Sequence, residues 1–245
     1  MTGEEGGGAT TEVSIVNKLI GKPDPLWLIS AVIAAALLIL AVFLPLWSME
    51  LVAPQYPSGL VMYAYGDHFE GETAGYYDGF DAVKEINGLN HYIGMKPIEA
   101  VNEMKLFIPG LLALSIAGIA ASFVTWKPRL FRGLIVAGFW FVPLFFIADL
   151  QYWLYDYGHT MNPDAALNTG DITPKVIGTT AVWNFHSQNG FEPGFYAIVM
   201  AAVIISFGPL LLRWLGRWRA RRHEATGDSS EATAGQHVSG GVAQP

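Results

Sequence analysis

The chain contains no cysteine among its 245 residues. This absence excludes disulfide bonds, thiolate metal sites, iron–sulfur clusters, a thiol nucleophile and a lipid-modified cysteine anchor. A metal bound by this chain must therefore be held by imidazole, thioether or oxygen ligands.

Charge is also scarce, because charged residues make up 14% of the chain and hydrophobic residues 52%. Soluble proteins carry about 25% charged residues, so this chain has too few to cover a water-soluble surface. Most of its surface is expected to face a lipid bilayer. The net charge of −7 argues against nucleic acid as a partner.

Long apolar runs predict an all-α membrane protein, because a helix of roughly 20 residues crosses the ~30 Å hydrocarbon layer. The four predicted transmembrane helices cover residues 25–48, 106–126, 134–154 and 195–214. The remaining segments are the tails 1–24 and 215–245, the long loops 49–105 and 155–194, and the short link 127–133.

The motifs of several enzyme classes are missing from the sequence. It has no Gly-rich phosphate-binding loop, no HExxH zinc motif and no nucleophile elbow. No histidine falls inside a predicted span, which excludes a haem held between two helices. We therefore expect a protein that is not an enzyme.

Basic residues are distributed unevenly around the predicted spans. The richer side carries ten: Lys18, Lys22, Lys127, Arg129, Arg132, Arg213, Arg217, Arg219, Arg221 and Arg222. The other side carries four: Lys84, Lys96, Lys105 and Lys175. Because basic residues mark the cytoplasmic side, both termini are predicted to lie in the cytoplasm and both long loops to face outward from the cell membrane. The N-terminal tail is expected to be partly disordered, and the C-terminal tail disordered beyond its basic cluster.

The outward loops are rich in aromatic residues, which indicates a folded outer domain. Residues 59–66 have the composition of a strand, residues 67–71 resemble a turn, and a second strand is predicted near residues 76–83. We expect a small outward-facing domain with a short β-hairpin.

Two short segments of these loops combine histidine with methionine. His91 and Met95 form one pair, and His159 and Met161 form the other. Thioether sulfur suits Cu(I), and imidazole binds either oxidation state of copper. If the segments converge, they form a copper site of two imidazoles and two thioethers. The same residue types also have a purely structural use, since methionine fills apolar gaps.

An acidic residue inside a predicted span is the other unusual feature. Asp149 lies near the outer end of the third span, and Asp156 follows one to two turns later. An acid at membrane depth is a functional candidate by default. We expect the two carboxylates to orient His159 from behind, although Asp149 could instead reach interfacial water or pair with a lysine.

Four phrases resemble a family of small multi-pass membrane proteins encoded beside nitrous oxide reductase and its copper-delivery proteins. They are residues 51–60 (LVAPQYPSGL), 86–95 (INGLNHYIGM), 153–159 (WLYDYGH) and 162–165 (NPDA). The resemblance covers about residues 26–215 and implies a role in copper handling for nitrous oxide reduction. The resemblance implies that His91, Met95, Asp156 and His159 take part in this role. Met161 lies outside the matched phrases and is a candidate ligand only because of its thioether.

The favoured function is therefore a membrane protein that binds or relays copper on the outer face. It would serve the maturation of a copper enzyme such as nitrous oxide reductase, with that enzyme or its copper-delivery proteins as partners. The alternatives are a metal-free membrane scaffold that docks an outer partner and an accessory subunit of a respiratory complex.

Overall fold

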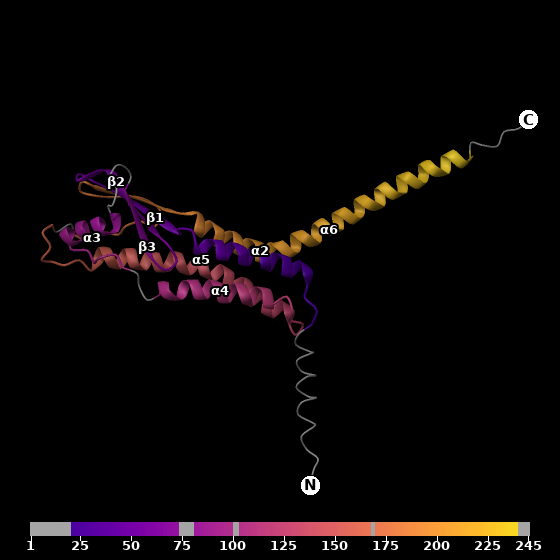
Figure 1. Cartoon of the computed structure of the whole chain (residues 1–245), viewed down its shortest axis with the longest axis horizontal. Coiled ribbons are helices and arrows are strands. Elements are labelled where there is room, and N and C mark those ends of the chain that lie inside the picture. The colour runs from indigo at the N-terminus through magenta and orange to yellow at the C-terminus, as the bar shows by residue number, and fades with distance from the viewer. Residues whose placement is uncertain (1–20, 74–80, 100–102, 168–169, 240–245) are drawn as a thin grey trace, which may run out of the picture.

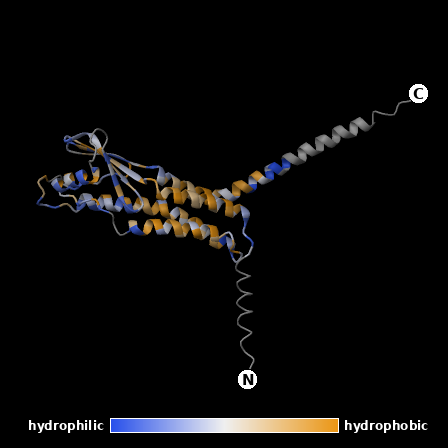
Figure 2. Ribbon diagram, viewed as in Figure 1, coloured by the Kyte–Doolittle hydropathy of each residue, from blue (hydrophilic) through white to orange (hydrophobic). Residues whose placement is uncertain are grey.

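The computed structural model describes residues 21–73, 81–99, 103–167 and 170–239. Three of the described helices are long and apolar enough to cross a membrane, namely α2 (Pro25–Val42), α5 (Pro128–His159) and the Pro193–Arg219 part of α6 (Pro193–Ser239). A further apolar helix, α4 (Met104–Ala120), is shorter. These helices run alongside one another in a bundle (Figure 1), and hydrophobic residues cover them (Figure 2). The helices therefore suit a lipid bilayer.

The ends of these helices differ from the predicted spans. α2 stops at Val42 rather than at residue 48, because Pro45 cannot continue a helix and Trp47 begins a strand. α4 ends at Ala120, short of residue 126, so the predicted count of four spans is not confirmed. α5 takes up the predicted link, since Pro128 occupies its first turn.

The C-terminal tail also departs from expectation. The sequence predicts a disordered segment after the basic cluster, but α6 continues as a helix to Ser239. Figure 1 shows this part of α6 projecting away from the bundle. Its Ala, Glu and Arg residues have good intrinsic helix propensity. The prediction relied on apolar periodicity, which this segment lacks.

A five-stranded antiparallel sheet stands at one end of the bundle, where the sequence predicts a single hairpin. Its strands are β1 (Trp47–Ala53), β2 (Tyr56–Ala64), β3 (Phe69–Thr73), β4 (Gly178–Val182) and β5 (Phe185–Phe191), in the order β3-β2-β1-β5-β4. The pairing of β1 with β5 joins the two long loops between the apolar helices. This pairing is long-range, so the local pattern of either loop does not reveal it.

The structure differs from the prediction near residues 76–83, where the sequence predicts a second hairpin strand. Residues 74–80 lie outside the described residues, and Ala82 begins the helix α3 (Ala82–Ile93). The side chain of Asp81 caps this helix by accepting hydrogen bonds from two backbone N–H groups, and Gly94 ends it in the left-handed conformation. An acidic N-cap and a C-terminal glycine are the signals that identify such a helix.

Two long arms, α2–β1 and β5–α6, run side by side, because α2 packs against α6 and β1 pairs with β5 (Figure 1). Small buried residues, including Ala34 and Ala201, let the two helices pack closely. Where the helices give way to strands, Glu192 donates a backbone hydrogen bond to Leu46 (3.0 Å) and Gly194 donates one to Pro45 (2.9 Å). A Cβ at position 194 would lie only 2.6 Å from the carbonyl oxygen of Pro45, so this approach requires glycine.

One face of the sheet is buried against helices. Leu60, Met62 and Ala64 alternate along β2 as buried residues, and they pack in one core with Ile86 of α3. Leu150 of α5 packs against the same core. The alternation of a half-buried strand therefore fixes which side chains point toward the bundle.

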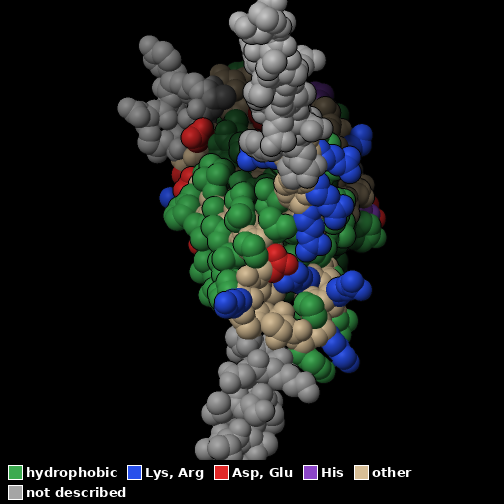
Figure 3. Space-filling view, turned by 90° about the vertical axis from the view of Figure 1, so that its right-hand side faces the viewer, with side chains coloured by type: hydrophobic (Ala, Val, Ile, Leu, Met, Phe, Trp, Pro, Cys, Tyr) green, Lys and Arg blue, Asp and Glu red, His purple; other side chains and the backbone are tan. Residues whose placement is uncertain are grey.

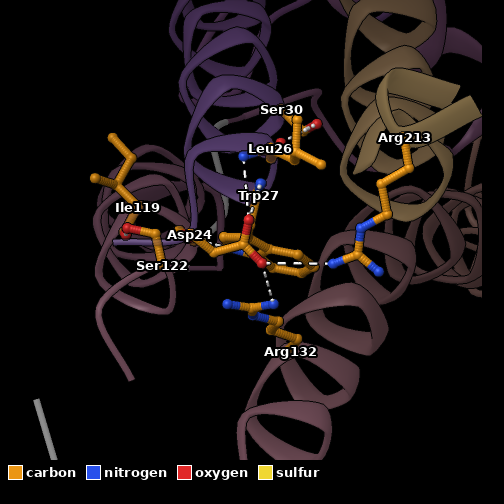
Figure 4. Close-up of polar contacts among 9 residues, drawn as sticks. Asp24, Leu26, Trp27, Ser30, Ile119, Ser122, Arg132 and Arg213 are labelled. Atoms are coloured by element: carbon orange, nitrogen blue, oxygen red, sulfur yellow. Dashed lines mark hydrogen bonds and ion pairs between the residues drawn. The ribbon is translucent and has the colours of Figure 1, made fainter. Parts of the chain in front are cut away.

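The opposite end of the bundle, here called the basic end, is held by one carboxylate. Asp24 caps α2 by accepting hydrogen bonds from the backbone N–H groups of Leu26 and Trp27. Its other oxygen accepts a hydrogen bond from Arg132 of α5 (2.8 Å) and lies 3.6 Å from a guanidinium nitrogen of Arg213 of α6 (Figure 4). One side chain thus connects three helices.

The Trp27 side chain extends this connection to α4. Its indole N–H donates to the carbonyl of Gly118 (3.0 Å), and the Arg132 guanidinium lies over its ring, 5.1 Å from the centroid. The Nε of Arg132 is buried with no hydrogen-bond partner among the described residues. The partly buried guanidinium is therefore stabilised by its contacts with Asp24 and the Trp27 ring. Figure 3 shows Lys and Arg side chains gathered at this end, which carries Lys22, Lys127, Arg129, Arg132, Arg213, Arg217, Arg219 and Arg221.

Partial burial raises the pKa of Asp24, but hydrogen bonds from Arg132 and the α2 backbone, together with the Arg132 charge, outweigh it. The net result is a pKa below the ordinary value of 3.8. The resulting stability is present above that ordinary value and is lost as the pH falls through the lower, folded-state pKa.

Replacing Asp24 should separate its two roles. Asp24→Asn keeps the N-cap but removes the charge, so we expect a loss of about 1–3 kcal/mol in the free energy of unfolding. Asp24→Ala should lose about 1 kcal/mol more, because the cap is gone as well. Unfolding of the detergent-solubilised chain at pH 7 measures both changes, with the exposed Asp171→Asn as control. Equal stability of Asp24→Asn and the control would contradict this account.

Candidate functional site

The structure brings the two histidine–methionine segments together at their backbones. The carbonyl of Gly94, directly before Met95, accepts a hydrogen bond from the N–H of Asn162, directly after Met161 (2.8 Å). Leu167 donates a second backbone hydrogen bond to Tyr92 (3.1 Å). The end of α3 and the end of α5, each with the residues that follow it, therefore meet. We call this contact the His–Met junction (residues 90–95 and 157–163).

Gly94 makes this junction possible. Its φ of +81° lies in the left-handed region that favours glycine. A Cβ at this position would lie 2.8 Å from the carbonyl oxygen of Asn162 and 2.9 Å from the Cβ of Ala165. Gly94 therefore has two roles: it ends α3, and it lets the backbone of this segment approach Asn162 closely.

The two histidines of the junction have different surroundings. His91 is exposed on the last turn of α3. His159 is half-buried at the end of α5, where its ring stacks on Tyr155 with centroids 3.8 Å apart. Its Nδ1 lies 2.9 Å from the Tyr155 carbonyl oxygen, which can only accept a hydrogen bond. We therefore assign the proton to Nδ1, which leaves Nε2 as the nitrogen able to bind a metal.

The two acidic residues expected behind His159 have contacts of their own. The carboxylate of Asp156 pairs with the ammonium of Lys96 (2.8 Å), so this ion pair also joins the α3 and α5 segments. Asp149 instead lines a cavity beneath the sheet, where Trp153 donates a hydrogen bond to its carboxylate. The backbone carbonyl of Tyr155 is the group that holds the His159 ring.

This cavity has a volume of about 210 Å³ and lies between the sheet, α3, the start of α4 and α5. Its wall is mostly apolar, but it contains four of the seven methionines of the chain: Met49, Met62, Met95 and Met104. Three carboxylate residues also line it: Glu99, Glu103 and Asp149. Sequence reasoning pairs Met95 with His91, whereas the fold places it among other methionines.

The other face of the sheet is acidic. Tyr63 lies on this face, and the charges of Glu72, Glu192 and Glu50 act on its hydroxyl. Burial and these three charges raise the pKa of Tyr63 above its ordinary value. No sequence period marks this surface, because the glutamates come from three different segments and only the strand register assembles them.

His68, which lies between β2 and β3, contacts two acidic neighbours. Its ring nitrogens lie 2.5 Å from Asp67 and 3.2 Å from Glu70. Burial lowers the pKa of His68, but the hydrogen bonds and charges of the two carboxylates outweigh burial and raise it above its ordinary value. A histidine that favours its protonated form is a poor metal ligand.

Among the described residues, no group of three or more His, Cys, Asp or Glu side chains is placed to hold a metal ion. In comparisons with known proteins, no family model and no curated sequence matches the chain.

Substitution of Gly94 tests the junction. Gly94→Ala should destabilise the fold by about 1–2 kcal/mol, because the left-handed conformation is unfavourable for alanine and its methyl group meets Asn162. Gly88→Ala is the matched control, since Gly88 lies inside α3 with nothing within 4 Å of a Cβ, and alanine should stabilise the helix by about 1 kcal/mol. Thermal unfolding and hydrogen exchange of the Asn162 amide measure the difference. Similar behaviour of the two variants would refute the close approach.

Proposed function

We propose that this chain is a non-enzymatic membrane protein that binds or relays copper on the outer face of the cell membrane. The observation that carries the proposal is the backbone hydrogen bond between Gly94 and Asn162, which joins the two histidine–methionine segments. Imidazole and thioether together suit copper, and thioether is a poor ligand for zinc, magnesium or calcium. The Nε2 of His159 provides a nitrogen with a lone pair for such a site.

In this proposal the basic end lies in the cytoplasm, as expected from the distribution of Lys and Arg. The sheet and the His–Met junction then face outward, where a copper enzyme such as nitrous oxide reductase would receive the ion. The resemblance of residues 86–95 and 153–159 to proteins encoded beside that enzyme supports this assignment. Nitrous oxide reductase or its copper-delivery proteins are the proposed partners.

The acidic face of the sheet favours a second candidate function. A surface bearing Glu50, Glu72 and Glu192 around Tyr63 suits a partner with a basic surface. In this alternative the chain is a metal-free scaffold that docks an outer protein or a respiratory complex. The two functions differ in whether the histidines of the junction matter.

Metal analysis distinguishes the two candidates. The detergent-purified chain is loaded with Cu(I) under reducing conditions and desalted, next to the His91→Ala, His159→Ala double variant and a His186→Ala control. His186 is an exposed histidine of β5, outside the junction. We expect bound copper in the wild type and the control, and a loss of about one ion per chain in the double variant.

Two results would contradict copper binding at the junction. One is wild-type protein that retains no copper after desalting. The other is a double variant that retains as much copper as the His186→Ala control. Either result favours the scaffold, for which charge reversal on the acidic face becomes the relevant experiment.

A further inference from the structure

Two methionines are neighbours on adjacent strands of the sheet. Met49 of β1 and Met62 of β2 are direct cross-strand partners, so their side chains lie on the same face with Cβ atoms about 5 Å apart. This face is the buried one, and Met62 is only 3% exposed. Both side chains line the cavity beneath the sheet. Strand register thus places two thioethers together at one wall.

Two more methionines reach the same cavity from other elements. Met95 follows α3, and Met104 begins α4. Methionine is unbranched and has three rotatable bonds, so these side chains can adjust around a ligand in a space of about 210 Å³. Met95 also belongs to the His–Met junction, which places the junction and the cavity next to each other along the chain.

The charge of the cavity favours a cation. Its polar side chains include Glu99, Glu103 and Asp149, and Glu103 is close enough to Asp149 for their charges to interact. The remaining wall is largely apolar, and a carboxylate acts over a longer range in such surroundings than in water. Cavities that serve only apolar molecules do not need three carboxylates.

We propose that this cavity is a thioether site for Cu(I), separate from the imidazole-containing site at the His–Met junction. Met49 and Met62 are its principal ligands, Met95 and Met104 are available to complete the coordination, and the carboxylates balance the positive charge. Cu(I) is the biological cation that soft, neutral thioethers select, whereas hard cations require oxygen ligands. This inference rests on the proposed copper function and adds a second binding site to it.

The test compares two sets of variants in the full-length, detergent-purified chain. Met49→Leu, Met62→Leu removes both sulfur atoms while roughly conserving volume, and Met200→Leu is the control because Met200 is a half-exposed methionine of α6 outside the cavity. The probe is Cu(I) supplied under reducing conditions. Copper per chain is measured by metal analysis, sulfur ligation by X-ray absorption at the copper edge, and folding by the unfolding temperature.

The expected result is two copper ions per chain in the wild type and in Met200→Leu. Met49→Leu, Met62→Leu should lose one ion and shift the ligation of the remaining copper toward nitrogen, at an unchanged unfolding temperature. The His91→Ala, His159→Ala variant should lose the other ion and shift the ligation of the remaining copper to sulfur alone. Single substitutions Met49→Leu and Met62→Leu, each weakening Cu(I) retention at least tenfold, provide a second measurement if the double variant does not fold.

Copper content and sulfur signal that stay at wild-type values in Met49→Leu, Met62→Leu would overturn the cavity site but leave the junction intact. Under that result, an apolar molecule retained in the cavity and detected by mass spectrometry would identify what the cavity holds instead. Absence of copper from the wild type would overturn both the cavity site and the proposed function.

Discussion

The antiparallel alignment of the α2–β1 and β5–α6 arms is the constraint on which the rest of the structure depends. Backbone groups at membrane depth must find partners within the protein. Both arms change from helical bonding to strand pairing at the same level, where Leu46 and Pro45 accept hydrogen bonds from Glu192 and Gly194. The sheet therefore begins close to the end of the bundle, with only residues 43–46 between α2 and β1 and only Glu192 between β5 and α6.

Because β1 and β5 are fixed in this way, every other outer element takes its position from them. β2 pairs with β1, and its alternating residues turn Met62 toward the helices. α3 then packs beneath the sheet, and its end meets the segment after α5 through Gly94. The cavity is the space that remains between these layers, so its methionines are brought together by register and packing from four separate segments of the chain.

The two ends of the molecule carry opposite charge. The basic end gathers Lys and Arg around Asp24 (Figures 3 and 4), which locks α2, α5 and α6 in place. The sheet end carries Glu50, Glu72 and Glu192 outside and further carboxylates within the cavity. A negative surface raises the local concentration of cations, and a cationic cargo is consistent with that end.

The sequence by itself determined the class of the protein. Apolar runs predict helices that suit a membrane because helical hydrogen bonds are local, and the absence of cysteine excludes thiolate ligands from any copper site. It also identified residues 90–95 and 157–163 as two segments that combine histidine with methionine. Only the tertiary structure decided that these segments meet, that the two long loops build one five-stranded sheet and that Met95 lies with Met49, Met62 and Met104. The physical reason is that strand register and helix packing join residues far apart in the chain, and no local period records which distant partner a strand will choose.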